Sequence, residues 1–260
     1  MTLAVVPFET YETSVAEALD ALGAGAVLKK QERILLKPNL VNDTPFPVTT
    51  APAFAEAVVR YVKSACKAEI VIAEGCGEPS MTTHEVFERL GYDKLAKRHG
   101  VKLIDLNTEP LLKKSIKGLF VFPEMHLPKI AFTHYIISLP VLKAHSLSVM
   151  TGTLKNMLGF APPKYYAGKH GIWNKAVFHN RIQDSISDLN AYLKPDLTVM
   201  DASVGLIDFH LGGPKCNPPV KKIMAGYDPY EIDREAARLL KIDPNSVGHL
   251  NAEKYKRQPE

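Results

Sequence analysis

Cysteine is scarce in this sequence of 260 residues, which contains only Cys66, Cys76 and Cys216. An odd number of widely spaced cysteines fits neither a disulfide framework nor a CxxC metal knuckle. The ferredoxin-type CxxCxxCxxxCP segment that holds iron-sulfur clusters is also missing. The sequence therefore indicates a reducing compartment. It contains no complete iron-sulfur motif, and it leaves any cofactor unidentified.

Long apolar runs are missing as well. No segment reaches the length that spans a bilayer, and the N-terminus lacks a basic region followed by a sustained apolar run. The formal net charge is only +4, so overall charge does not call for nucleic acid as a partner, although a local basic cleft can attract an anion. These absences predict a cytoplasmic globular protein that binds neither membrane nor nucleic acid.

The sequence does contain apolar runs of strand length that alternate with helical patterns. This alternation predicts one three-layer α/β domain over residues 1–260, with a mostly parallel or mixed sheet flanked by helices. The predicted strands are RILLKP, EIVIAEG, KLIDLN, YIISLP, DLTVMDA and KKIMAGY. The predicted helices are 13–23, 52–66, 82–98, 178–193 and 229–241. Asp228 is the expected N-cap of the last helix, with Pro229 in its first position.

Two stretches interrupt the alternation. Residues 108–133 read as short strands and turns without a crossover helix, which predicts a β excursion from the main sheet. Residues 160–177 are rich in proline, glycine, tyrosine and lysine, and predict a long ordered loop of the kind that is often functional.

Polar residues follow several of the predicted strands. In an open α/β sheet, ligands bind outside the carboxyl ends of the strands. The polar residues at these ends come from four predicted strands and are Lys37, Asn39, Glu74, Lys143, His145 and Asp201. Each also has an ordinary structural interpretation, as a solvated strand end, a helix-entry charge or a turn cap. Their convergence on one edge favours a substrate site.

The segment 137–160 is the most informative of these. Lys143 and His145 alternate on an extended stretch, so both side chains point to one side, where a cation and an imidazole suit an anionic substrate. Lys155 and Asn156 follow in TGTLKNMLG, which predicts a helix that opens near residue 153 toward an anion. A solvated helix face is the alternative interpretation.

Other candidates carry weaker signals. His170 and His179 flank Trp173, and with Asp184 they could complete a metal site, but the spacing matches no recognised ligand motif. Hydrogen-bonding roles are favoured, and no metal ligand is assigned. Cys76 lies between two glycines after a strand, where an exposed thiol would be a minor nucleophile hypothesis. Neither GxGxxG, GxxxxGK[ST] nor GxSxG occurs.

The ordered blocks ILLKPNLV, VIAEG, ISLPVLKAHSLSVMTGTLKNMLG, DLTVMDAS and AGYDPYEIDREAARLLKIDP resemble the DUF362 family, a domain of unknown function, from about residue 33 to 250. The chemistry of this family is largely unassigned, and its members carry iron-sulfur assignments when a ferredoxin-like segment is attached. This chain lacks that segment. It also departs from the family pattern after Asp201, where His210 stands among apolar residues.

Two functional classes stay open. The sequence favours a small-molecule enzyme that acts on a phosphate- or carboxylate-bearing substrate by lysine and histidine acid-base chemistry, with its reaction class unassigned. The catalytic candidates are Lys143, His145 and Lys155. The substrate-binding candidates are Lys37, Asn39, Glu74, Asn156, His170, His179 and Asp201. The alternative is a redox or electron-transfer module that works with a ferredoxin-like partner, using cysteines of two subunits in a homo-oligomer.

Overall fold

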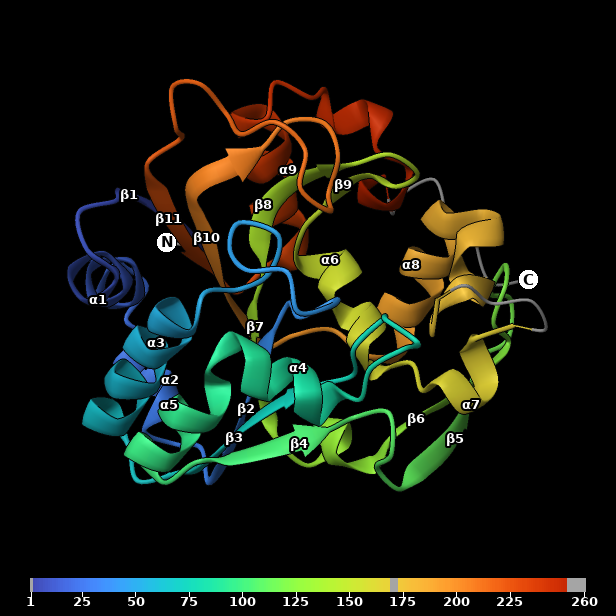
Figure 1. Ribbon diagram of the computed structural model, residues 1–260, viewed down its shortest axis with the longest axis horizontal. Coiled ribbons are helices and arrows are strands. Elements are labelled where there is room, and N and C mark those ends of the chain that lie inside the picture. Colours follow the sequence, from blue (N-terminus) through green and yellow to red (C-terminus); the bar gives the residue numbers. More distant parts are fainter. Residues whose placement is uncertain (1, 169–172, 252–260) are drawn as a thin grey trace.

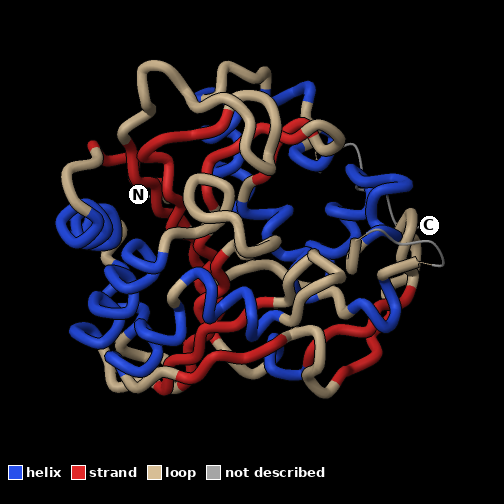
Figure 2. The backbone as a smooth tube through the Cα atoms, viewed as in Figure 1, coloured by secondary structure: helices blue, strands red, loops and turns tan. Residues whose placement is uncertain are grey.

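A computed structural model of the chain describes residues 2–168 and 173–251 (Figures 1 and 2). The main sheet consists of β1 (Leu3–Pro7), β2 (Arg33–Pro38), β3 (Glu69–Glu74), β4 (Lys102–Asp105), β7 (Tyr135–Leu139), β8 (Val141–His145), β9 (Val149–Thr151), β10 (Leu197–Leu206) and β11 (Lys222–Gly226). The α-helices are α1 (Tyr11–Ala21), α2 (Ala24–Leu28), α3 (Pro52–Ala65), α4 (Thr83–Leu90), α5 (Tyr92–His99), α6 (Thr153–Asn156), α7 (Pro163–Tyr166), α8 (Ile182–Tyr192) and α9 (Pro229–Leu239).

The strand order in the main sheet is β1-β11-β10-β7-β2-β3-β4. Strands β10, β7, β2, β3 and β4 run parallel, whereas β11 pairs antiparallel with both β10 and β1. The predicted mostly parallel sheet flanked by helices is therefore confirmed. The sequence did not predict β1, which closes the antiparallel edge.

Successive side chains of the buried strands point to opposite faces of the sheet, and the helices that cover these two faces complete three layers. In β2, Ile34 and Leu36 pack into the core under α1 to α5, whereas Leu35 packs into the core shared with α8 and α9. Strands that are buried on both faces read as continuous apolar runs. This is why RILLKP was recognisable as a strand, and Figure 1 shows the two helical layers on opposite sides of the sheet.

Strands β7 and β8 form one path through the core, interrupted at Pro140. Strand β10 accompanies both of them, because Leu197 pairs with Ile137 of β7 and Leu206 with Lys143 of β8. The chain therefore crosses the buried sheet and carries Lys143 and His145 beyond the end of β7. A short antiparallel partner, β9, follows at once. The sequence predicted β7 and an extended stretch at Lys143 and His145, but it did not list β8 as a strand and it missed β9.

The local signals for helix ends were largely correct. Asp228 caps α9 by accepting the N–H of Tyr230 at 2.8 Å, and Pro229 occupies the first helical position, as predicted. The helix predicted over 82–98 is instead two helices, because Gly91 adopts φ 86°, a left-handed conformation that ends α4. The small helix α2 was not predicted.

The predicted β excursion is the two-stranded antiparallel sheet of β5 (Leu111–Ser115) and β6 (Glu124–Pro128). Buried Asp188 of α8 holds its connecting loop by accepting the N–H groups of Val121 and Phe122 at 2.6 and 2.9 Å. The stretch predicted as a long loop contains the single turn α7, and residues 169–172 lie outside the described residues.

Candidate functional site

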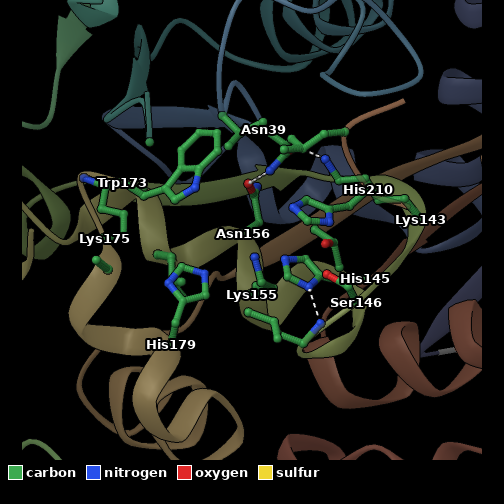
Figure 3. A pocket seen from close by; sticks show the side chains of 18 of the residues that line it. Asn39, Lys143, His145, Ser146, Lys155, Asn156, Trp173, Lys175, His179 and His210 are labelled. Atoms are coloured by element: carbon green, nitrogen blue, oxygen red, sulfur yellow. Dashed lines mark hydrogen bonds between the residues drawn. The ribbon is translucent and has the colours of Figure 1, made fainter. Parts of the chain in front are cut away.

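A cavity of about 560 Å³ lies beyond the carboxyl ends of β2, β3 and β8. Its wall combines residues after these strands with α6, the 3₁₀ turns Met157–Phe160 and Ala176–Arg181, and the loop after β10. The polar side chains that line it are Asn39, Glu74, Lys143, His145, Ser146, Thr151, Lys155, Asn156, Lys175, His179 and His210 (Figure 3). The larger apolar ones are Val41, Leu147, Leu158, Trp173, Phe209 and Leu211.

The structure brings most of the predicted site residues together at this cavity. Those that line it are Asn39, Glu74, Lys143, His145, Lys155, Asn156 and His179. Lys37 is fully buried behind the wall and is not among the described lining residues. Asp201 is also placed elsewhere, where it accepts the hydroxyl of Tyr11 at 2.8 Å and that of Ser203 at 2.6 Å. His170 lies outside the described residues.

Lys37 and Glu74 form a buried ion pair beneath the cavity. The Lys37 Nζ lies 2.7 Å from Glu74 Oε2 and donates a second hydrogen bond to the Pro38 carbonyl at 2.9 Å. Glu74 also accepts the N–H of Leu40 at 3.0 Å and that of Gly75 at 2.7 Å. Burial lowers the pKa of Lys37, and the charge of Glu74 opposes that shift. Lys37 therefore supports the cavity wall through Glu74.

Gly159 allows this pair to lie where it does. A Cβ at this position would lie 2.0 Å from Glu74 Oε1 and 2.5 Å from Lys37 Nζ, distances that real atoms do not tolerate. Because both partners are buried, the backbone would have to move. We expect Gly159→Ala to lower the free energy of unfolding by about 1–3 kcal/mol in urea titrations. Gly25→Ala is the matched control, since its Cβ meets only Tyr61 Oη at 3.7 Å. Equal stability of the two variants would contradict this account of Gly159.

Two neutral oxygen atoms accept hydrogen bonds from the Lys143 amine. Its Nζ donates to Asn39 Oδ1 at 2.9 Å and to the Val48 carbonyl at 2.6 Å. Asn39 in turn donates to Asn156 Oδ1 at 3.3 Å (Figure 3). Burial, followed by repulsion from Lys155, lowers the pKa of Lys143 to about 7. Lys143 is therefore poised to lose its charge near neutral pH.

The imidazoles at the cavity are neutral. The His145 Nδ1 accepts the Leu147 N–H at 3.0 Å, so its proton resides on Nε2. The ring stacks on His210 with 3.7 Å between centroids and 14° between planes. Burial and the neighbouring lysines lower the pKa of His210 to about 3 and hold that of His145 far below its usual range. The pKa of His179 is also lowered, again mainly by burial.

Lys155, which is partly exposed, differs from the buried lysines of this region. Lys175 donates to Asn107 Oδ1 at 2.5 Å and to the Ala161 carbonyl, and its pKa falls to about 7 through burial. Lys155 has no hydrogen-bond or ion-pair partner within residues 2–168 and 173–251. Burial lowers its pKa to about 8. Its amine lies between His179 on one side and the stacked His145 and His210 on the other (Figure 3).

Two further polar atoms of the wall lack partners in the described structure. Thr151 Oγ1 and His210 Nδ1 are buried and make no hydrogen bond. Buried polar atoms are normally satisfied, and each one that is not costs about 1–3 kcal/mol. Beside the Lys155 amine, these two atoms add to the unmet hydrogen-bonding capacity of the wall.

A helix does begin at Thr153, as predicted, but its first amides are not open to a bound anion. Helix α6 is a single turn, and its Thr153 and Leu154 N–H groups already donate to the two carboxylate oxygens of Asp233 at 2.6 and 2.9 Å. A Cβ on Gly152 would lie 2.3 Å from Asp233 Oδ1, so this glycine admits the carboxylate. The amides that were expected to bind a ligand are capped from within the protein.

Several functional candidates were missed or misplaced in the predictions from the sequence. Lys175 belongs to the stretch 160–177 that was predicted to be functional, but nothing marked it individually. His210 was noted only as a departure from the family pattern. Asp184 pairs with Arg181 at 2.7 Å, so it does not share a metal site with His179. Cys76 is fully buried, and burial raises its pKa, so the expected exposed thiol is wrong.

The remaining sequence-based alternatives concern cofactors and membranes. The three cysteines are free. Among the described residues, no group of three or more histidine, cysteine, aspartate or glutamate side chains is arranged to hold a metal ion. Within residues 2–168 and 173–251, no helix is both long enough and apolar enough to span a membrane.

Comparisons with known proteins place the chain in context. The model of a family described as "Domain of unknown function (DUF362)" matches residues 34–238. The chain is 26% identical over 253 residues to a thylakoid-associated protein of Synechocystis sp., covering 92% of this chain and 73% of that protein. Because that relative is described as thylakoid-associated, the cytoplasmic location expected from the sequence stays a prediction.

A solved structure shares the fold. The lactate racemase apoprotein from Thermoanaerobacterium thermosaccharolyticum is similar with a TM-score of 0.54 and 12% sequence identity, over 90% of this chain and 56% of that protein. The chain thus spans a little over half of the length of this neighbour. At this level of identity, the likeness supports the fold alone.

Proposed function

This chain belongs to the DUF362 family, and we propose that it is an enzyme that binds a small carboxylate- or phosphate-bearing molecule in the cavity. In this proposal, Lys155 is the reactive amine of an acid-base mechanism. The observation that carries it is the Lys155 amine, which lies unpartnered among neutral imidazoles while every other lysine of this wall is held by acceptors. A catalytic base works best when its pKa is close to the working pH.

Charge balance at the cavity supports an anionic ligand. Among its described residues the wall contains Lys143, Lys155 and Lys175, whereas the one carboxylate there, Glu74, is already paired with Lys37. Desolvated cations without counter-charges are unfavourable, and a bound anion restores the balance. The apolar side chains at the same wall would receive the rest of the molecule.

The histidines are better suited to binding than to proton removal. Their lowered pKa values make His145 and His210 weak bases, although the sequence had suggested His145 or Lys143 for proton transfer. With Nδ1 of His145 occupied by a backbone N–H, its Nε2–H is a fixed donor for a ligand oxygen. Lys143 is held by two acceptors, which leaves Lys155 as the amine that is free to react.

Thermal unfolding tests the anion site. We expect phosphate to raise the melting temperature of the wild-type protein in a saturable manner, compared with chloride at matched ionic strength, because a ligand that binds the folded state stabilises it. Lys155→Met should lose this saturable part and retain the general salting effect of phosphate. Lys113→Ala, which removes an exposed lysine of β5, is the matched control and should respond as the wild type does. An equal response of all three proteins would reject the anion site.

Binding of sulfate should weaken as the pH rises. The pKa is about 7 for Lys143, about 8 for Lys155 and about 7 for Lys175. Sulfate binds the ammonium forms, so above pH 7 binding requires uptake of protons and the affinity falls. We expect the dissociation constant, measured by calorimetry, to be at least about 10-fold larger at pH 9 than at pH 6.5. An affinity that is constant over this range would contradict the involvement of these lysines.

A further inference from the structure

The surroundings of Lys155 differ from those of the other lysines that line the cavity. Lys143 and Lys175 are each held in place by two acceptors. The Lys155 amine has no acceptor within the described residues and reaches into the middle of the cavity (Figure 3). It is attached to the single turn α6, which Asp233 clamps at both amide groups. The amine is thus free, but the backbone that carries it is fixed.

We propose that Lys155 is a nucleophile that forms an imine with a carbonyl compound carrying an anionic group, such as a 2-oxo acid. This inference rests on the proposed anion-binding function and specifies the class of its ligand. The carbonyl carbon would lie at the Lys155 amine, and the anionic group would face Lys143, whose charge is close enough to Lys155 to be repelled by it. A lysine in such a desolvated setting reacts with carbonyl compounds because its neutral form is available near neutral pH.

The reaction balances without a further reactant. The neutral amine of Lys155 attacks the carbonyl carbon, forming a C–N bond and a carbinolamine. The former carbonyl oxygen then leaves as water and takes both amine protons, so the products are one imine and one water molecule. The Nε2–H of His145 is a donor for the carbinolamine oxygen, because Nδ1 of that ring is occupied by the Leu147 N–H.

The surrounding groups favour this chemistry at Lys155 over the other lysines. Burial lowers the pKa of Lys155 to about 8, which makes the neutral fraction at neutral pH on the order of 100-fold larger than for an exposed lysine. The pKa values of Lys143 and Lys175 are also low, but the nitrogen of each is engaged by two acceptors. An attacking amine must approach its carbonyl along a free direction, which Lys155 alone offers among the described lysines of the wall.

Reductive trapping tests the inference on the intact protein. Glyoxylate, with cyanoborohydride as the hydride donor, should convert the imine into a stable secondary amine, which peptide mapping by mass spectrometry can locate. We expect labelling of Lys155 to be about 10- to 100-fold faster than labelling of exposed lysines such as Lys113. Propanal, which has a carbonyl but no anionic group, should label Lys155 far more slowly than glyoxylate. Labelling at random surface lysines, or none at Lys155, would overturn the proposal.

Two controls separate this inference from the proposed function. Phosphate should protect Lys155 of the wild-type protein from glyoxylate, an observation that requires no variant to fold. Lys155→Arg should lose the adduct and keep part of the stabilisation by phosphate, because it retains the charge and removes the nucleophile. If phosphate stabilises the wild type but glyoxylate forms no adduct, the imine is rejected and the anion site stands. If phosphate neither stabilises the wild type nor slows its labelling, the anion site is rejected. If propanal then labels Lys155 as fast as glyoxylate does, the proposed anionic ligand class is rejected as well.

Discussion

Replacing Glu74 with alanine is expected to lower the free energy of unfolding by about 3–5 kcal/mol, because it leaves the fully buried ammonium of Lys37 without its counter-charge. Only the Pro38 carbonyl would remain as an acceptor for Lys37. The N–H groups of Leu40 and Gly75 would lose their acceptor as well. Urea titrations at pH 7 measure this loss.

A matched control lies on the same strand. Glu69 of β3 pairs with Lys102 of β4 at the same N–O distance of 2.7 Å, but this pair is exposed to solvent. Exposed ion pairs contribute little because water screens both charges. We therefore expect Glu69→Ala to leave the unfolding curve essentially unchanged. Similar losses in the two variants would show that burial does not decide the strength of the Lys37–Glu74 pair.

The double variant Lys37→Met/Glu74→Gln sharpens the test. It removes both charges at once, so no uncompensated charge remains in the core. We expect it to be more stable than Glu74→Ala, even though it contains an additional substitution. If the double variant is as unstable as the single one, the cost of Glu74→Ala arises from lost packing or lost amide acceptors and not from the stranded ammonium.

Removing the carboxylate of Asp233 is the second change with a large expected effect. Asp233→Ala leaves the buried N–H groups of Thr153 and Leu154 without acceptors. At about 1–3 kcal/mol for each of the two unsatisfied groups, the loss in free energy of unfolding should be about 2–6 kcal/mol at pH 7. Because α6 carries Lys155, labelling of Lys155 by glyoxylate should also slow.

Helix α9 also provides a control for Asp233→Ala. Asp228→Ala removes an exposed N-cap that accepts one N–H, and should cost only about 1 kcal/mol.

Burial raises the pKa of Asp233 from 3.8 to about 6. Between pH 3.8 and 6, Asp233 is ionised in the unfolded chain but still protonated in the folded protein. Its contribution to the free energy of unfolding is therefore complete below pH 4 and declines as the pH rises to 6. The gap between wild type and Asp233→Ala should therefore narrow from pH 4 to pH 6. A gap that widens over this window would contradict the assignment.

The sequence determined the framework of this protein through short-range patterns. Apolar runs and helical periodicity were sufficient to predict the parallel core strands and most long helices, because burial on one or both faces leaves a period in the chain. Helix ends were readable where one residue sets the local backbone, as Asp228 and Pro229 do for α9. The gathering of polar residues at the carboxyl ends followed from the topology of parallel sheets. Ordered sequence blocks were also sufficient to predict the DUF362 family, which the family comparison confirmed.

Only the tertiary structure decided which of these polar residues are free to act. Lys143 and Lys155 look alike in the sequence, yet Lys143 meets an acceptor 104 positions away in Asn39, and Lys155 meets none within the described residues. The amides of α6 looked available until Asp233, 80 positions further on, was found to occupy them. Hydrogen bonds between side chains that are distant in sequence leave no local period, because they depend on where the packed core places each partner. For this reason the sequence could indicate a polar site, whereas the fold decided that Lys155 is its unpartnered amine.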